Sequence, residues 1–478
     1  MAKRRKQQVQ LPSTVQARSR GSWALGVGVL ALGAGILVGQ HPLALSFTHP
    51  LSQLPTESLP TGADPSSDGP GENLGFDSPP AAVMANLIAP LAAGDGLAAQ
   101  QVPSYLSRLG SRGFSPSQQG IWLQTQDQYL FDHQGSEPLP AASLVKVAVT
   151  LAALDRFGAE HRFETQFVPT GPIEAGTLRG DLVVIGGEDP FFVWEAAVSV
   201  GQRLQETGIQ RIEGDLVIQG RFYMNFLTDP ARSGDLLRQG LNAAIWPAEA
   251  EAQFQTLPAG TPRPQIEILG TVRVADPSGE AGGTAPVRHY SLPLAELLKL
   301  MNRYSNNLMA DMVANAVGGH QQVAARSAEL IGIPQSEIQL INGSGLGMEN
   351  RMSPRAVVGL FLQIQKLAGS TGLTVGDLFE VVGLDEGVLE QRLLPAPLVA
   401  KSGTLNQVSS LAGVIPTRDR GLIWFAIMNQ SPELVYAREQ QGRLLSDLQQ
   451  GWGRESILPT TLHPQPSRRG LTFLTELF

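Results

Sequence analysis

Six lysines occur in this 478-residue chain, and two of them, Lys146 and Lys401, stand in short motifs that suit acyl transfer. The amine of lysine can lose its proton when its surroundings favour the neutral form, whereas the guanidinium of arginine does not in practice. The other 29 basic residues are arginine. In a chain that otherwise prefers arginine, a lysine marks a position where an amine able to lose its proton could be needed.

The first motif is Ser143-Leu-Val-Lys146. Residues 143–157 are apolar on nearly every face and end at Gly158, which predicts a buried central helix that begins at Ser143. A serine at a helix start lies beside free N–H groups, and a lysine three residues later lies one turn away on the same face. Burial would lower the pKa of Lys146 and let the neutral amine accept the Ser143 proton. A solvated lysine gives the same spacing on many helices, so the motif alone is weak.

The second motif is Ser305-Asn306-Asn307, in the middle of RYSNNLMADM. Three hydrogen-bonding side chains here interrupt a helical stretch over residues 293–317. Taken by itself, the triplet is more typical of a helix break or cap than of a functional site. Its value depends on the other motifs.

The third motif is Lys401-Ser402-Gly403-Thr404, which we expect on a strand. A cation accompanied by two hydroxyls could hold a substrate carboxylate, and Gly403 lets another backbone approach closely. The alternative for this motif is an exposed hairpin turn.

The elements that must position these motifs follow from periodicity and turn signals. A β-hairpin is expected at residues 120–133, and a final amphipathic helix at 434–450. A mostly β module is expected between the first and second motifs. Its strands are predicted at residues 180–190, 214–220 and 264–274, with later strands at 403–412 and 422–428 and a further helix at 354–367.

The N-terminal region has the composition of an export leader. Residues 1–40 carry six basic residues and no acidic one, and residues 21–39 are 19 residues without a charge. As a helix these would reach roughly 28 Å, nearly one hydrocarbon thickness. An uncleaved membrane anchor with its basic end in the cytoplasm is favoured over a cleaved signal peptide. The rest of the chain would then lie outside the cytoplasm, in the periplasm, or be secreted if the leader is cleaved.

Composition excludes several classes of protein. The net charge is -8, and beyond residue 40 there are 29 basic residues against 43 acidic ones, which argues against nucleic-acid binding. Because the chain has no cysteine, it cannot form disulfides, Cys-ligated metal sites or a thiol nucleophile. The seven histidines are scattered, so we expect neither a metal nor an organic cofactor.

Together and in this order, the three motifs match the set found in β-lactamases and penicillin-binding proteins. The sequence resembles the class C low-molecular-mass penicillin-binding proteins, the D-alanyl-D-alanine carboxypeptidase/endopeptidase family. The long gap between Lys146 and Ser305 is similar to the insertion of that family. Further likeness lies in the approach to Ser143, in the Gly-Asp-Leu segments at 180 and 214, and in residues 186–190, 342–346 and 350–354.

The resemblance implies an α+β fold: an antiparallel sheet flanked by helices, with an inserted mostly β domain. The sequence departs from the family at two positions: it has Asn342 where the family often has Asp, and Ser402 where the family often has Thr. In some relatives an acidic residue of the insert is thought to contact the substrate side chain. The candidates for this residue here are Asp229 and Asp235. The predicted segments are a cytoplasmic leader (1–20), an anchor or signal segment (21–39), a Pro/Ser/Gly-rich linker (40–90), a peptidase domain (91–162 and 291–455), an inserted β-rich domain (163–290) and a loosely ordered tail (456–478).

The resemblance also implies an exported, penicillin-sensitive serine DD-peptidase acting on peptidoglycan stem peptides, with β-lactams as covalent inhibitors. Ser143 would be the nucleophile, Lys146 its base, and Ser305 a proton relay with Lys401. Asn307 would hold the peptide amide. Lys401, Ser402, Gly403 and Thr404 would form the strand that binds the terminal carboxylate. Two alternatives stay open: another Ser/Lys hydrolase, such as a β-lactamase or an esterase, and a catalytically silent wall-binding protein.

Overall fold

The computed structural model describes residues 87–276, 284–468 and 472–478. The predicted leader, the segment 21–39 and most of the linker lie outside these residues. The last residues of the predicted linker belong to the folded part, because Ile88 and Ala89 are buried and the Ala89 N–H donates to the side chain of Gln124. The described residues form two compact units, a larger one of residues 87–162 and 292–468 and a smaller one of 163–291 and 472–478.

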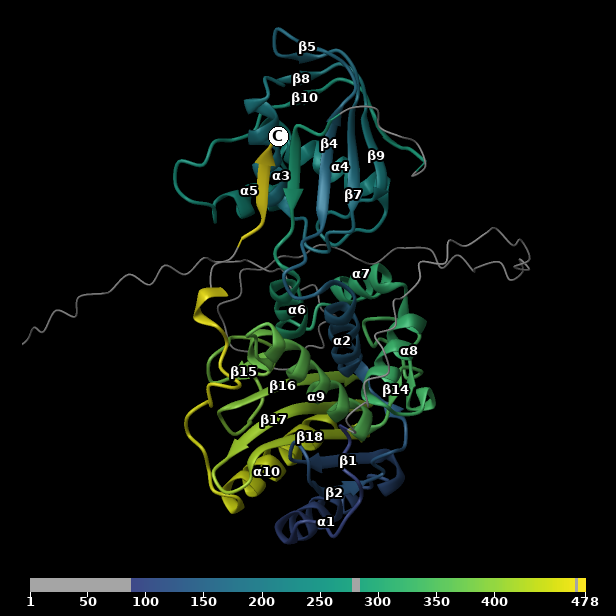
Figure 1. The fold of residues 1–478 in the computed structure, drawn as a ribbon. Coiled ribbons are helices and arrows are strands. Elements are labelled where there is room, and N and C mark those ends of the chain that lie inside the picture. Colours follow the sequence, from purple (N-terminus) through teal and green to yellow (C-terminus); the bar gives the residue numbers. More distant parts are fainter. Residues whose placement is uncertain (1–86, 277–283, 469–471) are drawn as a thin grey trace, which may run out of the picture. The chain divides into compact units, whose positions relative to one another are not determined.

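The larger unit is built on an antiparallel sheet with the strand order β15-β16-β17-β18-β1-β2 (Figure 1). The hairpin predicted at residues 120–133 is its β1/β2 pair, in which Trp122 lies opposite Asp132. The strands of this sheet are β1 (Gln119–Gln124), β2 (Tyr129–His133), β15 (Glu380–Val382), β16 (Leu398–Leu405), β17 (Val408–Thr417) and β18 (Gly421–Gln430). A small sheet, β13-β14-β3, joins β13 (Ile338–Gln339), β14 (Arg351–Met352) and β3 (Leu139–Pro140).

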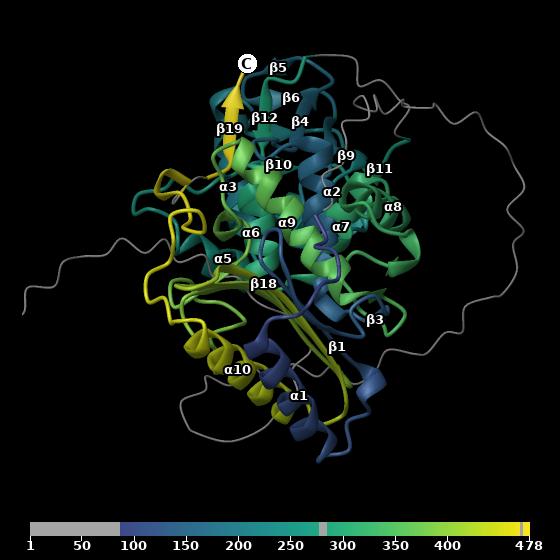
Figure 2. The same ribbon diagram turned by 60° about the horizontal axis from the view of Figure 1, so that its bottom comes forward.

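Helices cover both faces of the main sheet. Figure 2 shows α1 and α10 side by side on one face and α9 on the other. Because side chains alternate along a strand, Ile423, Phe425 and Ile427 of β18 all face the α1/α10 layer and join its core. The helices of this unit are α1 (Gly96–Gly110), α2 (Val145–Phe157), α6 (Leu294–Arg303), α7 (Asn307–Val317), α8 (His320–Ile331), α9 (Pro354–Ser370) and α10 (Leu434–Gly451).

Helix α2 is the central helix that the sequence predicts. It packs against α6, α7, α8 and α9, and its residues from Val145 to Leu154 are buried. A short 3₁₀ turn, η2 (Ala142–Leu144), leads into it, and Gly158 ends it with φ +79°. Because other helices surround α2, the position of its first turn, and of the η2 turn before it, is fixed.

The smaller unit combines its strands with the helices α3, α4 and α5, so it contains more helix than the predicted mostly β insertion. Strands β7, β9 and β11 are parallel, and parallel neighbours require crossover connections, which helices supply here. The residues Trp194, Ala197, Val198, Gly201 and Leu204 are buried at helical spacing in α3. The unit's longer elements are β4 (Glu164–Pro169), β7 (Leu182–Gly187), α3 (Trp194–Glu206), β9 (Leu216–Arg221), α4 (Pro230–Gly240), α5 (Ala248–Phe254), β11 (Val272–Val274), β12 (Val287–Tyr290) and β19 (Leu474–Leu477). Its two-residue strands are β5 (Ile173–Glu174), β6 (Thr177–Leu178), β8 (Arg211–Ile212) and β10 (Glu267–Ile268).

The tail predicted to be loose over residues 456–478 contains a strand and an ion pair where the structure describes it. The last strand, β19, pairs antiparallel with β12, and Arg468 forms an ion pair with Glu296 at 2.6 Å. The polar, proline-containing tail shows no hydrophobic periodicity that would predict this strand. The strand forms by pairing with the backbone of β12. Among the described residues, no helix combines the length and the apolar character needed to cross a bilayer.

Candidate active site

Ser143 lies in the tight turn η2 that precedes α2. The residue before it, Ala142, has φ +50°, an uncommon conformation for a residue with a side chain. Gly345, with φ +84°, lies directly against this turn, and a Cβ at Gly345 would come within 2.0 Å of the Ala142 carbonyl oxygen. The backbone before Ser143 is therefore held by a second loop as well as by the helix.

Lys146 lies within reach of Ser143 and is fully buried, with 0% of its surface exposed. Its Nζ lies 3.2 Å from the Ser143 Oγ, 2.8 Å from the Asn307 Oδ1 and 2.6 Å from the Ser344 carbonyl oxygen. A neutral amine has two hydrogens and one lone pair. The Asn307 and Ser344 oxygens accept the two hydrogens, which leaves the lone pair for the Ser143 proton.

Electrostatics favour that neutral form. The pKa of Lys146 is lowered well below its usual value, first by burial and then by the nearby charge of Lys401, while Asp311 opposes the shift. An uncharged lysine beside a hydroxyl is the arrangement that activates a serine nucleophile.

The turn between α6 and α7 connects the two lysines. Ser305 occupies this turn with φ +53°, and its Oγ lies 3.0 Å from the Lys401 Nζ. Asn307, two residues later, begins α7 and contacts Lys146. Asn306 between them caps α7, because its side chain accepts the Met309 N–H. The motif is both a helix cap and part of the cluster.

Lys401 is buried on β16, where its Nζ also donates to the Ser402 carbonyl oxygen at 2.7 Å. The pKa of Lys401 is lowered to about 7, mainly by burial and also by the charge of Arg392, against the opposing influence of Glu380. Glu380 itself is 1% exposed, and burial raises its pKa to about 7. Both oxygens of its carboxylate accept the Leu389 N–H, at 2.9 and 3.0 Å.

Strand β16 presents an open edge beside these groups. Its neighbour β15 pairs with it only as far as Ala400, and in the described part of the chain no strand pairs with that side from Lys401 onward. Leu405 and Val408 close a two-residue hairpin, so Gly403 exchanges hydrogen bonds with β17 while the N–H of Thr404 points to the open edge. An extended peptide can add to such an edge.

Gly403 allows β16 to lie against the Ser143 turn. A Cβ at this position would come within 2.3 Å of the Ser410 Oγ and 2.8 Å of the Ala141 carbonyl oxygen. The Ser410 hydroxyl in turn donates to that Ala141 oxygen at 2.9 Å. The structure thus brings all the sequence-predicted site residues into one cluster within the larger unit: Ser143, Lys146, Ser305, Asn307, Lys401, Ser402, Gly403 and Thr404.

Sequence reasoning noted residues 342–346 only as a likeness to the family and missed that this loop supports the cluster. Asp311 of α7 accepts the Gly343 and Ser344 N–H groups at 2.9 and 2.8 Å, which places the Ser344 carbonyl against Lys146. Asn342, to which the sequence assigns no role, accepts the Gly345 N–H at 2.8 Å and the Ser344 hydroxyl at 3.1 Å. An uncharged amide therefore suffices to hold the loop. The repeated small and polar residues of 342–346 were the available signal.

Asp229 and Asp235, the candidates for an acidic residue that contacts the substrate side chain, both lie at helix α4 of the smaller unit. Asp229 caps α4, because its carboxylate accepts the Arg232 N–H at 2.8 Å. Asp235 lies within α4. Neither is assigned a substrate contact.

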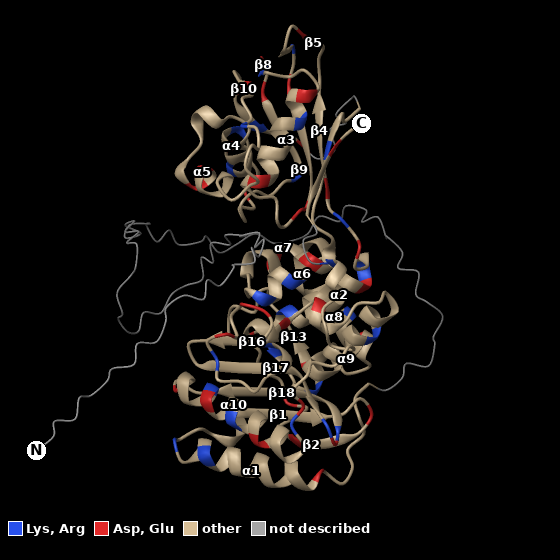
Figure 3. Ribbon diagram, turned by 90° about the vertical axis from the view of Figure 1, so that its left-hand side faces the viewer, with Lys and Arg blue, Asp and Glu red and all other residues tan. Residues whose placement is uncertain are grey.

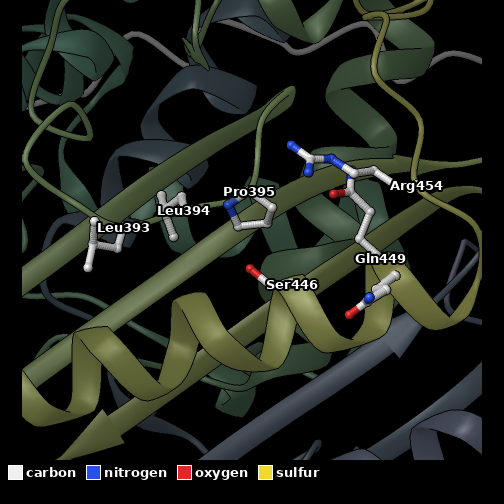
Figure 4. Close-up of a pocket in the computed structure, with 7 residues that line it drawn as sticks. Leu393, Leu394, Pro395, Ser446, Gln449 and Arg454 are labelled. Atoms are coloured by element: carbon white, nitrogen blue, oxygen red, sulfur yellow. The ribbon is translucent and has the colours of Figure 1, made fainter.

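A separate hollow of about 450 Å³ lies beside α10, and none of the predicted site residues lines it (Figure 4). Figure 4 shows Leu393, Leu394 and Pro395 along one side and Ser446 and Gln449 of α10 along the other. This hollow is not the candidate site, because it brings together no nucleophile and base.

Comparison with known proteins adds independent findings. The sequence profile described as the D-Ala-D-Ala carboxypeptidase 3 (S13) family matches residues 114–229 and 233–447. D-alanyl-D-alanine carboxypeptidase DacB of Haemophilus influenzae is 26% identical over 399 residues, which cover 62% of this chain and 81% of that protein. A D-alanyl-D-alanine carboxypeptidase of Actinomadura sp. is 24% identical over 407 residues, covering 63% of this chain and 75% of that protein.

Solved structures share the fold. The penicillin G-acylated predatory endopeptidase Bd3459 of Bdellovibrio bacteriovorus, in complex with an immunity protein, superposes with a TM-score of 0.63 at 22% identity, covering 74% of this chain and 97% of that chain. Penicillin binding protein 4 (dacB) of Haemophilus influenzae gives a TM-score of 0.53 at 20% identity, covering 71% of this chain and 99% of that chain.

Proposed function

Because the chain belongs to the D-Ala-D-Ala carboxypeptidase 3 (S13) family of serine peptidases, we propose that it hydrolyses the D-Ala-D-Ala bond of peptidoglycan stem peptides through an acyl-enzyme on Ser143. The family and the α+β penicillin-binding fold expected from the motifs are confirmed. The proposal depends on one observation above others: the buried Lys146 Nζ lies 3.2 Å from the Ser143 Oγ.

In the acylation step, the Ser143 Oγ attacks the carbonyl of the penultimate D-alanine while its proton passes to the neutral Lys146. The N–H groups of Ser143 and Thr404 stabilise the oxyanion. When the resulting tetrahedral intermediate collapses, the peptide bond breaks. A proton delivered through Ser305 and Lys401 lets D-alanine leave as an amine. Asn307 holds the peptide amide, and Lys401, Ser402 and Thr404 hold the terminal carboxylate.

In the second step, water attacks the ester carbonyl and returns a proton to the Ser143 Oγ. The shortened peptide leaves with a free carboxylate. A β-lactam would acylate the same serine, but its ring-opened product stays attached and obstructs the water. Penicillin should therefore label the protein covalently.

Fluorescent penicillin tests the proposal directly. We expect the full chain to be labelled at one site, and Ser143→Ala to abolish the label because it removes the hydroxyl beside Lys146. Ser410→Ala is a matched control, because this buried hydroxyl on β17 lies next to the turn without contacting Lys146. An unlabelled wild type that still binds wall fragments would favour the silent wall-binding protein instead. Rapid turnover of the penicillin would favour a β-lactamase.

Whether the enzyme removes terminal D-alanine, cleaves cross-links or does both is a separate matter. The relatives include D-Ala-D-Ala carboxypeptidases, and a protein of the same fold is described as an endopeptidase. Digestion of purified cell wall, with free D-alanine measured against split cross-links, distinguishes the two activities.

The proposed place of action is outside the cytoplasm, where peptidoglycan lies. The uncharged segment 21–39 after a basic leader supports an anchor or a signal segment. Figure 3 shows acidic and basic residues mixed over the described elements. Fractionation of cells that express the full chain, with and without residues 21–39, tests this location.

The pH dependence should report Lys401. Because its pKa is about 7, we expect kcat/KM to fall above about pH 7 as the cation that binds the carboxylate loses its proton. The charge of Glu380 raises the pKa of Lys401, whereas burial and Arg392 lower it. Glu380→Gln removes the group that raises this pKa. The falling limb should therefore move to lower pH by about one unit.

The glutamine is nearly isosteric and can still accept the Leu389 N–H, so folding should be retained. Glu439→Gln, at an exposed position of α10, controls for a general change in charge. A falling limb that stays in place in Glu380→Gln would show that Lys401 does not control it.

A further inference from the structure

Arg438 lies at the end of the carboxylate-binding strand, although no motif includes it. It projects from the second turn of α10, and its Nη2 donates to the Thr404 Oγ1 at 3.0 Å. Within the described part of the chain, no acidic side chain forms an ion pair with Arg438, and its buried Nε has no hydrogen-bond partner. A buried donor without a partner carries a free-energy cost, which an anion could relieve.

The surroundings of Arg438 are positively charged. Its charge lowers the pKa of Arg392, which in turn helps to lower the pKa of Lys401. The buried acid that counters Arg392 and Lys401 is Glu380. Three cations and one carboxylate leave an excess of positive charge at this end of β16. Such a region favours a bound anion.

The hydrogen bond to Thr404 also sets the direction of the hydroxyl. A hydroxyl has one hydrogen and two lone pairs, and here one lone pair is taken by the Arg438 N–H. The hydrogen of Thr404 is therefore free to be donated elsewhere. Thr404 is exposed, and its own N–H points to the open edge of β16, where the substrate would lie.

We propose that Arg438 is a specificity residue for the terminal carboxylate of the substrate, acting through Thr404 and through the positive charge of its own guanidinium. This inference rests on the proposed function and deepens it. Arg438 positions the Thr404 hydroxyl as a donor and adds a second cation to that of Lys401. A guanidinium suits this task because its planar donors match a carboxylate.

The test compares two peptides that share the same scissile bond. One is an N-acylated tripeptide that ends in D-Ala-D-Ala, and the other is its C-terminal amide, which lacks the charge. We expect Arg438→Gln to lower kcat/KM for the free carboxylate by about 10-fold to 100-fold, the range of one charge-assisted hydrogen bond. For the amide the loss should be below about 3-fold. Most of the loss should appear in KM, because the carboxylate is bound equally before and during reaction.

Two further variants complete the test. Arg438→Lys keeps the charge and should recover part of the preference for the carboxylate. Arg443→Gln is a control on the same helix, where Arg443 is 60% exposed and pairs with Asp447 at 3.7 Å. Equal losses for both peptides in Arg438→Gln would mean a merely structural role and would overturn the inference, as would no loss. A wild type that cleaves neither peptide and is not labelled by penicillin would instead overturn the proposed function, and the inference with it.

Discussion

Replacing Lys146 by methionine should slow acylation of Ser143 by about 10³-fold or more, since it removes the proposed base for the serine proton. Methionine has a similar length and an apolar stem that fits the fully buried position, although the Asn307 and Ser344 oxygens lose the donor that lysine supplies. The measurement is the second-order rate constant for fluorescent penicillin. Without the amine, no lysine among the described residues lies beside the Ser143 hydroxyl to accept its proton.

Lys366→Met provides the matched control. Lys366 is exposed on α9, so its loss removes a lysine from the same unit without touching the cluster. The Lys366→Met variant should be acylated by fluorescent penicillin at the wild-type rate. If Lys146→Met kept its rate within about 10-fold of the wild type while staying folded by circular dichroism, Lys146 could not be the base.

Gly345→Ala should damage both stability and acylation. A side chain at φ +84° costs roughly 1–2 kcal/mol, and forcing a Cβ to within 2.0 Å of the Ala142 carbonyl adds roughly 1–3 kcal/mol of strain. The turn can relieve this contact only by moving Ala142 and with it Ser143. A displacement of about 1 Å at a nucleophile lowers rates by about 100-fold. Urea unfolding and penicillin labelling measure the two effects.

Gly421→Ala separates the two causes. Gly421 lies at the start of β18 with φ +67°, and a Cβ there would meet no atom within 4 Å. This variant should lose only about 1 kcal/mol of unfolding free energy and should acylate normally. Equal acylation by both variants would show that the 342–346 loop does not position Ser143.

The elements nearest the site were the most predictable from sequence. The buried helix after Ser143 has an apolar run with a single lysine, Lys146, before its end region and a glycine stop, and these local signals agree with the tertiary environment. The final helix was predicted at residues 434–450 and spans Leu434–Gly451. The single strand predicted at 403–412 was wrong, because Asn406 and Gln407 form a turn that lacks the usual glycine signal.

The contacts between residues far apart in the sequence could not be predicted from local patterns. Ser305 lies close to Lys401 across 96 positions of sequence, and Ser344 lies close to Lys146 across 198. No local pattern encodes such distances, so only the match of three motifs to a known order indicated them. Arg438 and Glu380 match no motif, and they were missed because burial and charge around a residue emerge only from packing.

The open edge of β16 has a consequence for inhibition. A ligand that lies along the strand gains backbone hydrogen bonds without depending on a strained four-membered ring. A short extended amide ending in an anion, with an electrophile placed opposite Ser143, would use the strand and the cations together. Chemistry of this kind would be untouched by enzymes that destroy penicillins, because it contains no lactam for them to open.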